Sequence, residues 1–239
     1  MKHTYLVFLL CFLTLQSVAQ KDVTTVGIQV KPIIPVQFST MADVQVQENN
    51  MEVKYAQKLG NTFGVVIRRG FTDNFAIETG LGFARRNYKV TLTEFDDGYT
   101  ESADFGFIGY EIPVQALYYV QMSERIFLNT AAGISFDMFP SDVEAFKNNL
   151  VHFSYRYAWV RPSMLANIGA EYRSRKQGYF YVGLSYHRPF KPIIVNQTTY
   201  AKIGQLDKTI QTTLNGHYLT LDFRYFFNEP PERKQVRRK

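Results

Sequence analysis

Apolar and polar residues alternate with a period of two through most of the chain beyond residue 20. In the stretch GYEIPVQALYYV, residues 109–120, one set of alternate positions carries Tyr, Ile, Val, Ala, Tyr and Val; the other carries Gly, Glu, Pro, Gln, Leu and Tyr. Successive side chains of a strand point to opposite faces, so this pattern predicts a strand with one apolar and one mixed face. Segments of this kind predict eight strands, at 24–38, 56–71, 75–92, 103–121, 126–138, 154–173, 179–188 and 216–227.

The connections between these segments alternate in length. Short turns are predicted at 72–74, 122–125 and 174–178, whereas long loops fall near 39–55, 93–102, 139–153 and 189–215. Bacterial outer-membrane barrels show this asymmetry, with short periplasmic turns and longer external loops. Since no repeat, low-complexity tract or linker divides residues 20–227, we expect one all-β domain, an eight-stranded antiparallel up-and-down barrel.

The volumes of the side chains decide which face of this barrel points inward. In the third segment, Phe75, Ile77 and Leu81 alternate with Glu78 and Gly80. The interior of an eight-stranded barrel is just wide enough for side chains to fill, and rows of Phe, Leu and Tyr would overfill it. We therefore predict that the apolar face points outward into lipid, as in a transmembrane β-barrel, and not inward as in a soluble lipocalin-like barrel.

Aromatic residues are predicted to form a girdle at each membrane interface, which is typical of such barrels. The girdle near the short turns is expected to contain Phe71, Phe75, Tyr118, Phe127, Tyr172, Phe180, Tyr225 and Phe227. The girdle toward the long loops is expected to contain Phe83, Phe105, Phe107, Phe136 and Tyr186.

The ends of the chain differ in composition from its body. Residues 1–19, with Lys2, an apolar run over 6–15 and a final Ser-Val-Ala, predict a secretory signal peptide. Cys11 is the only cysteine, so no disulfide is expected in the mature chain; a lipoprotein signal using it would need small residues before it. Residues 228–239 form a charged tail with five basic and two acidic residues, expected to lie in the periplasm.

Charge and hydropathy exclude two classes of protein. No apolar run of about 18 residues follows the signal, which argues against transmembrane helices. The formal net charge of +6 lies partly in the tail, so the body is nearly balanced, and no nucleic-acid partner is expected.

Three stretches resemble a known family: TVGIQVKPIIPVQF near the start, YEIPVQALYY in the centre and LTLDFRYFF at the end. They are similar to the outer-membrane β-barrel family common in Bacteroidota, which includes PorT-like proteins, and the resemblance covers nearly all of residues 20–227. It implies a location in the cell outer membrane and, through PorT, a connection with protein secretion. The tail after Phe227 departs from the pattern, because outer-membrane proteins often end at a terminal aromatic residue.

Several charged residues lie on the face predicted to point into the barrel. Arg68 and Glu78 are expected to lie opposite each other across the turn centred on Asp73, and such a pair is tolerable inside a barrel because each charge is satisfied. Pro113 removes a ladder donor, so we expect a β-bulge there. We interpret the inward charges as a polar core network, with a proton or substrate path as the alternative. They are Arg68, Glu78, Arg86, Glu111, Glu171, Asp222 and Arg224.

Two weaker patterns suggest chemistry. Ser185 and His187 share one face of a predicted strand, and Glu171 could face the same hairpin from the strand before it. A serine, a histidine and a carboxylate are the usual catalytic residues of lipid-modifying outer-membrane enzymes, but no nucleophile motif accompanies these three. The acidic stretch 93–102 contains Glu94, Asp96 and Asp97, candidates for a divalent cation, without the spacing of a calcium loop.

The sequence thus predicts a small outer-membrane barrel without an open pore, whose structural or binding role is carried by its extracellular loops. The basic segment 189–215 is expected to face the acidic stretch 93–102. The expected surroundings are outer-membrane lipid and lipopolysaccharide, with an envelope or secretion protein as a further partner. We expect a monomer, no cofactor and no enzymatic activity; the alternatives are an accessory subunit of a secretion or envelope machine and a lipid-modifying enzyme.

Overall fold

The computed structural model describes residues 23–35, 44–174 and 177–227, which form thirteen strands. Within these ranges no helix is long and apolar enough to cross a membrane. The predicted signal peptide and charged tail lie outside the described residues. The all-β class predicted from the alternation is therefore confirmed.

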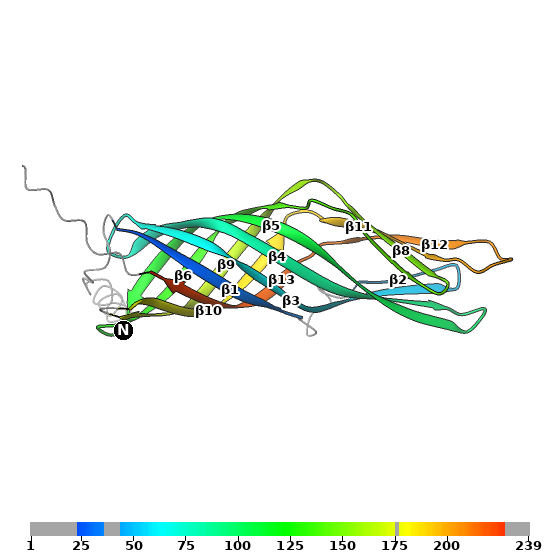
Figure 1. The fold of residues 1–239 in the computed structure, drawn as a ribbon, viewed down its shortest axis with the longest axis horizontal. Helices are drawn as coiled ribbons and strands as arrows, with labels where there is room; N and C mark the ends of the chain where they lie inside the picture. Colours follow the sequence, from blue (N-terminus) through cyan, green and yellow to red (C-terminus); the bar gives the residue numbers. More distant parts are fainter. Residues whose placement is uncertain (1–22, 36–43, 175–176, 228–239) are drawn as a thin grey trace, which may run out of the picture.

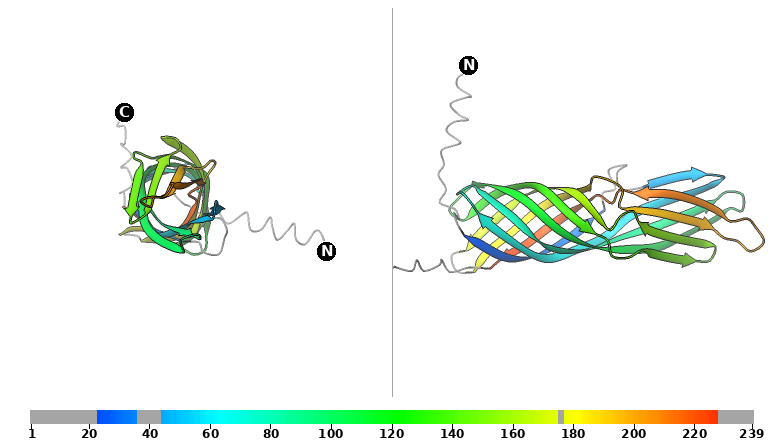
Figure 2. Two further views of the ribbon diagram at one scale, coloured as in Figure 1. Left: turned by 90° about the vertical axis from the view of Figure 1, so that its right-hand side faces the viewer. Right: turned by 90° about the horizontal axis from the view of Figure 1, so that it is seen from above.

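Nine of the strands form one antiparallel sheet that curls into a barrel (Figures 1 and 2). The strand order is β1-β13-β10-β9-β6-β5-β4-β3-β2, and β1 pairs with β3 as well as with β13. Viewed end-on in Figure 2, the strands surround a central axis. Their bounds are β1 Thr24–Ile34, β2 Val44–Glu48, β3 Met51–Gly70, β4 Phe75–Glu94, β5 Tyr99–Gln121, β6 Ile126–Met138, β9 Val160–Ser174, β10 Gly178–Pro189 and β13 Tyr218–Phe226.

The other four strands form a second antiparallel sheet, in the order β12-β11-β8-β7. They are β7 Val143–Lys147, β8 Leu150–Arg156, β11 Ile194–Tyr200 and β12 Lys208–Leu214. This sheet lies beyond one end of the barrel, at the right of Figure 1, with β7 beside β5 and β12 beside β2. We call residues 44–58, 86–107, 139–159 and 190–217, which build this part of the molecule, the extension.

The prediction of eight strands was incomplete, because the long connections are largely strands themselves. The predicted loop 93–102 is a tight turn at 95–98 between the long strands β4 and β5. The other three predicted loops contain β2, the β7–β8 hairpin and the β11–β12 hairpin, and the segment predicted at 154–173 is divided between β8 and β9. The antiparallel meander itself is confirmed. Its long connections, together with the ends of the long strands, form a second packed unit.

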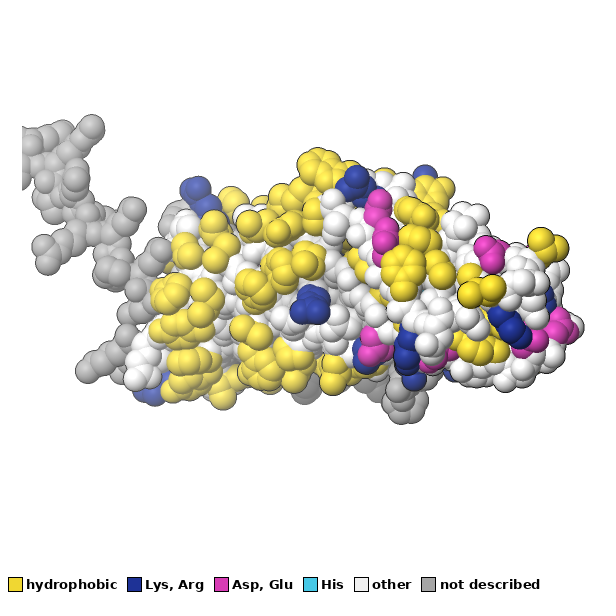
Figure 3. Space-filling model, turned by 45° about the vertical axis from the view of Figure 1, so that its right-hand side comes forward, with side chains coloured by type: hydrophobic (Ala, Val, Ile, Leu, Met, Phe, Trp, Pro, Cys, Tyr) yellow, Lys and Arg dark blue, Asp and Glu magenta, His cyan; other side chains and the backbone are white. Residues whose placement is uncertain are grey.

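The apolar face of the barrel points outward, as the volume argument predicted. On β5, Tyr110 and Val114 are exposed, whereas Glu111 and Gln115 between them are buried. On the face shown in Figure 3, hydrophobic side chains predominate toward the left, and most of the charged side chains lie toward the right. An exposed apolar surface of this extent is stable in contact with lipid and not with water.

The hydrophobic pattern inverts where the barrel passes into the extension, although each strand keeps the same orientation. On β4, the inward residue Glu78 is polar, but Tyr88 and Leu92 further along the same face are apolar and fully buried. On the outward face, apolar Leu81 gives way to Lys89. Water must surround the extension, since it has an apolar core inside and charged side chains outside. The inversion therefore marks the membrane boundary near residues 85–88 of β4.

This inversion corrects part of the predicted aromatic girdles. Phe105 and Phe107 belong to the core of the extension, where Tyr88 stacks on both at centroid distances of 5.6 Å. Phe127 is also buried, beneath the Arg173 guanidinium, whose Cζ atom lies 3.7 Å from the ring centroid. The prediction that these three rings lie in the girdles is wrong, because all three are buried and point inward.

The bulge expected at Pro113 is also wrong. The register of β4 with β5 continues unshifted from Thr79↔Val114 to Gly82↔Glu111, and Pro113 pairs with Ser135 on β6. The Pro113 carbonyl accepts a hydrogen bond from the Thr79 hydroxyl at 2.8 Å. The barrel therefore accommodates the missing N–H in a regular ladder, and the register shift lies instead between Lys58 and Asn61 of β3.

Candidate functional site

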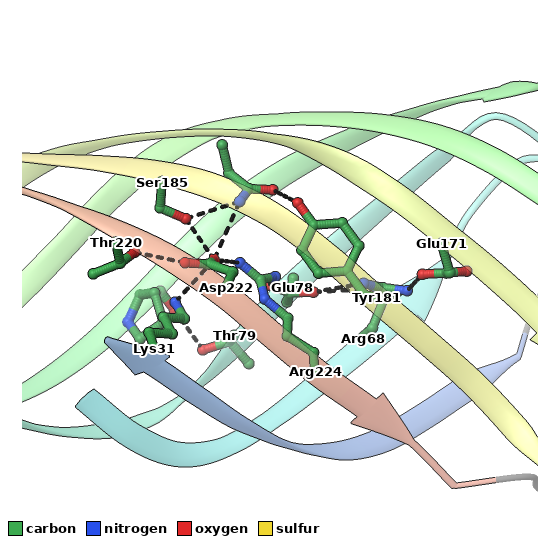
Figure 4. Close-up of polar contacts among 12 residues, drawn as sticks. Lys31, Arg68, Glu78, Thr79, Glu171, Tyr181, Ser185, Thr220, Asp222 and Arg224 are labelled. Carbon is green, nitrogen blue, oxygen red and sulfur yellow. Dashed lines mark hydrogen bonds and ion pairs between the residues drawn. The ribbon is translucent and has the colours of Figure 1, made fainter. Parts of the chain in front are cut away.

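A network of ion pairs fills the lumen of the barrel (Figure 4). Arg68 and Glu78 are directly opposed in the register of β3 and β4, and the Arg68 Nε and Nη2 atoms both donate to Glu78 Oε2, at 3.2 and 3.0 Å. Arg68 Nη1 also donates to Glu171 Oε2 on β9 at 2.5 Å. The second oxygen of Glu78 accepts from Arg224 Nη1, and Arg224 Nη2 donates to Asp222 Oδ2 at 2.7 Å.

Further cations extend this network toward both ends. Toward the short turns, Arg173 Nε donates to Glu171 Oε1 at 2.7 Å. Toward the extension, Lys31 Nζ lies 3.7 Å from Asp222 Oδ2. Ser185 and Asn167 also donate to Asp222 Oδ2, so that carboxylate is saturated with donors.

A second cluster closes the lumen beneath the extension. Arg86 Nη2 lies 3.0 Å from Glu111 Oε1 and 3.4 Å from Asp137 Oδ2. The His187 Nε2 atom lies 2.6 Å from the same Asp137 oxygen, and its Nδ1 atom lies 2.9 Å from the Tyr218 hydroxyl, which donates to Glu111. Arg86 is completely buried, with its Cζ atom 4.6 Å from the Tyr218 ring centroid.

The charges in these two clusters balance. The cations are Lys31, Arg68, Arg86, Arg173 and Arg224, and the carboxylates are Glu78, Glu111, Asp137, Glu171 and Asp222. A buried charge is tolerated when it is paired and hydrogen-bonded, so equal numbers of each sign give a stable polar core. All seven charges predicted to point inward lie in this network. Lys31, Arg173 and Asp137 were missed, although each lies on an inward position of its strand.

The packing of these side chains leaves little free space. A cavity of about 20 Å³ lies between the two clusters, with Lys31, Glu111 and His187 among its lining residues. That volume holds roughly one water molecule.

The candidate catalytic residues do not form one site. Ser185 donates to Asp222, His187 contacts Asp137 and Tyr218, and Glu171 binds Arg68 and Arg173. In the ladder of β9 and β10, Ser185 pairs with Asn167, four residues from Glu171, which is about 13 Å along a strand. A hydrolase needs its nucleophile and base within hydrogen-bond reach, and these contacts place each candidate with a different partner.

A different group of three residues has donor atoms close enough to hold a metal ion. The donor atoms of Glu111, Asp137 and His187 lie within 4.8 Å of one another, and all three residues are buried. The Arg86 guanidinium already contacts both carboxylates. It supplies the positive charge that a cation would bring, so the cluster is complete as an ion-pair network.

The acidic residues proposed for a divalent cation are paired with lysines of the β11–β12 hairpin. Lys208 Nζ lies 2.6 Å from Glu94 Oε1 and 2.7 Å from Asp96 Oδ2, and Lys202 Nζ lies 3.1 Å from Asp97 Oδ2. The hydrogen bond from Lys208 lowers the pKa of Asp96 below its usual value. The basic segment 189–215 thus contacts the acidic stretch 93–102, as its charge suggested.

The extension has its own core, with a buried polar chain inside it. His152 is fully buried; its Nδ1 atom lies 2.8 Å from the Thr198 hydroxyl and its Nε2 atom 2.8 Å from the Ser154 hydroxyl. The Tyr55 hydroxyl joins the chain at Thr198, and the His152 ring centroid lies 4.4 Å from that of Phe105. Burial lowers the pKa of His152 to about 4. These hydrogen bonds join β3, which belongs to the barrel sheet, to β8 and β11 of the second sheet. They therefore help to fix how the two sheets pack against each other in the extension.

The outward apolar face, the charged lumen and the antiparallel ladder together define an outer-membrane β-barrel protein. Residues 24–195 match the model of the family described as outer membrane protein beta-barrel domain. The chain belongs to this family, and its location is the outer membrane.

A solved structure agrees with this fold. The outer membrane protein OprG from Pseudomonas aeruginosa is 10% identical, with a TM-score of 0.52, covering 90% of this chain and 100% of OprG. The outer membrane protease OmpT from Escherichia coli is also 10% identical, covering 85% of this chain and 96% of OmpT, with a TM-score of 0.44. No curated protein sequence matches the chain.

Proposed function

We propose that this protein is a closed outer-membrane barrel that holds the extension outside the cell as a rigid binding element. The observation that carries the proposal is the contrast between the two halves of the molecule. The lumen is filled with paired charges, whereas the extension has a separate hydrophobic core of sixteen buried residues. Binding residues are commonly presented by segments that a rigid scaffold holds in place.

The membrane-crossing unit in this proposal has eight strands, β1, β3, β4, β5, β6, β9, β10 and β13. The pairing of β1 with both β3 and β13 supports closure, because it leaves no free edge among these eight. The short turns lie in the periplasm and the extension outside, following the asymmetry of such barrels. A closed ladder resists detergent until it is heated, so the folded protein should migrate differently on a gel before and after boiling.

Conductance in a planar bilayer tests the absence of a pore. A lumen filled by paired charged side chains, in which the cavity between the two clusters holds about one water molecule, should give no steady single-channel current. The double variant R68A/E78A, which removes the central pair of charges, is the informative comparison, since only that variant should conduct. Steady conductance by the unaltered chain would exclude the proposal and favour a transport path through the lumen.

A partner for the extension is the second element of the proposal. The resemblance to PorT-like proteins makes an envelope or secretion protein the partner class to test first, by co-purification from outer membranes with and without the extension hairpins. A lipid-modifying enzyme receives less support, because the Ser185 hydroxyl is bonded to Asp222 and not to an imidazole.

A further inference from the structure

The outer surface of the barrel changes from apolar to cationic where β10 leaves the membrane. Leu184 is half exposed on the lipid-facing surface of β10, and Arg188 occupies the same face four residues further on. In the ladder, Arg188 lies directly opposite Met164 of β9, itself an exposed apolar residue. The guanidinium is thus beside an exposed apolar side chain of the barrel surface.

A groove of about 270 Å³ opens at this boundary. Met164 lies at its membrane side, Arg188 and Lys191 supply two cationic groups, and His217 lines the groove from a second chain segment. Phe190, which also lines the groove, is 61% exposed, and its backbone N–H donates to the Pro162 carbonyl at 3.2 Å. The groove therefore combines an apolar side, toward the membrane, with a cationic side, toward the extension.

Arg188 and Lys191 have no acidic partner among the described residues. None of the described residues that line the groove is acidic. Two exposed lysines of the extension are paired instead, Lys58 with Asp104 and Lys147 with Glu101. Two cations at a membrane boundary without a carboxylate are an anion site, and arginine suits phosphate because its guanidinium donates two parallel hydrogen bonds.

We propose that this groove binds the phosphorylated headgroup of a lipid of the outer leaflet, lipid A, with phosphate on Arg188 and Lys191 and an acyl chain against Met164. The composition of the groove argues for a lipid and against free phosphate, because Met164 and Phe190 contribute apolar contacts that an inorganic ion cannot use. Basic pockets of membrane proteins at the headgroup level bind anionic lipids in the same way. The choice of lipid A rests on the proposed orientation, in which the extension lies outside the cell.

Binding of defined lipids to the full-length protein in neutral detergent, measured by native mass spectrometry, tests the site. Bisphosphorylated lipid A should bind about tenfold more tightly than the same lipid after enzymatic removal of its phosphates. The R188Q/K191Q variant should lose that preference, whereas K54Q/K89Q, which removes the same charge from the extension elsewhere, should keep it. Inorganic phosphate at millimolar concentration should not displace the lipid.

Each contrary result has a distinct meaning. Equal binding of lipid A with and without phosphates by the unaltered protein would exclude the site, and this comparison needs no variant to fold. Displacement by inorganic phosphate would exclude the lipid contacts. Tighter binding of phosphatidylglycerol than of lipid A would overturn the outer-leaflet assignment and the orientation on which it rests, while leaving the conductance test of the closed barrel unaffected.

Discussion

Arg68 and Glu78 face each other across β3 and β4, yet neither residue depends on the other alone. Arg68 also donates to Glu171, and Glu78 also accepts from Arg224. The pair is therefore the middle of a series of ion pairs that crosses the lumen. Replacing either residue changes the balance of positive and negative charges in the whole series.

We expect R68Q and E78Q each to lower the free energy of unfolding by about 3 kcal/mol, because each leaves one buried charge in excess. The double variant restores equal numbers of charges, so its loss should be about 2 kcal/mol smaller than the sum of the two single losses. Urea unfolding in lipid vesicles, followed by the circular dichroism of the strands, measures all three. R69Q, at the adjacent exposed position, is the control for an Arg-to-Gln change. Additive losses would show that the two side chains are not coupled.

The register of this pair could be predicted from the sequence because local rules determine it. The turn centred on Asp73 fixes which residues are opposed, and the period of two fixes which face each residue takes. Side-chain volume then decides that Gly and charged residues, and not rows of Phe and Leu, fill a narrow lumen. No long-range contact had to be known for any of these steps.

His152 makes the stability of the extension depend on pH. Its pKa in the folded protein is about 4, against about 6.5 in an unfolded chain, so between these values the unfolded state binds the additional proton. Stability is therefore full above pH 6.5 and falls as the pH decreases toward 4, by about 2.5 kcal/mol at pH 4.5. Hydrogen exchange of the β8 and β11 amides at pH 7 and pH 4.5, corrected for intrinsic rates, measures the change. In H152Q this part of the pH dependence should disappear; if it persists, carboxylates of the extension are responsible.

Lys208 should hold the β11–β12 hairpin against the turn at 95–98. In K208M, Glu94 and Asp96 lose their shared cation, so the pKa of Asp96 should rise toward its usual value. We expect proteolysis within residues 201–207 to be faster in K208M than in the unaltered protein. Added salt should change the rate less in K208M, because that variant lacks the Lys208 ion pairs that salt screens in the unaltered protein. K54M, which alters an exposed lysine of β3, is the matched control. Equal cleavage of K208M and the unaltered chain at low salt would show that the core alone holds the hairpin.

The extension escaped prediction because β2, β11 and β12 are short and rich in Gln and Thr, and because β8 and β11 pair over long separations in sequence, from Ile194↔Arg156 to Tyr200↔Leu150. A local signal was nevertheless present. Asn49 and Asn50 both have positive φ angles, of 51° and 57°, and form the two-residue turn between β2 and β3. Asn148, at a φ of 48°, begins the corresponding turn between β7 and β8. Asn tolerates this conformation better than most residues, so the two Asn-Asn pairs could have indicated hairpins.

Deleting the β11–β12 hairpin should unfold the extension without unfolding the barrel. Replacing residues 195–213 with a two-residue Asn-Gly turn removes Tyr200 and Ile210 from the core of the extension and takes away the strand that pairs with β8. The barrel ladder is unaffected, since the pairing of β10 with β13 ends at His187↔Tyr218, outside the deleted segment. The shortened protein should therefore still migrate differently on a gel before and after boiling, while the amides of residues 143–156 lose their protection from hydrogen exchange. A control that replaces only residues 201–207 with the same turn keeps Tyr200 and Ile210 and should retain that protection. If residues 143–156 stay protected after the longer deletion, the second sheet is held by the barrel and not by its own core, and the extension is not the independent packed unit on which the binding proposal depends.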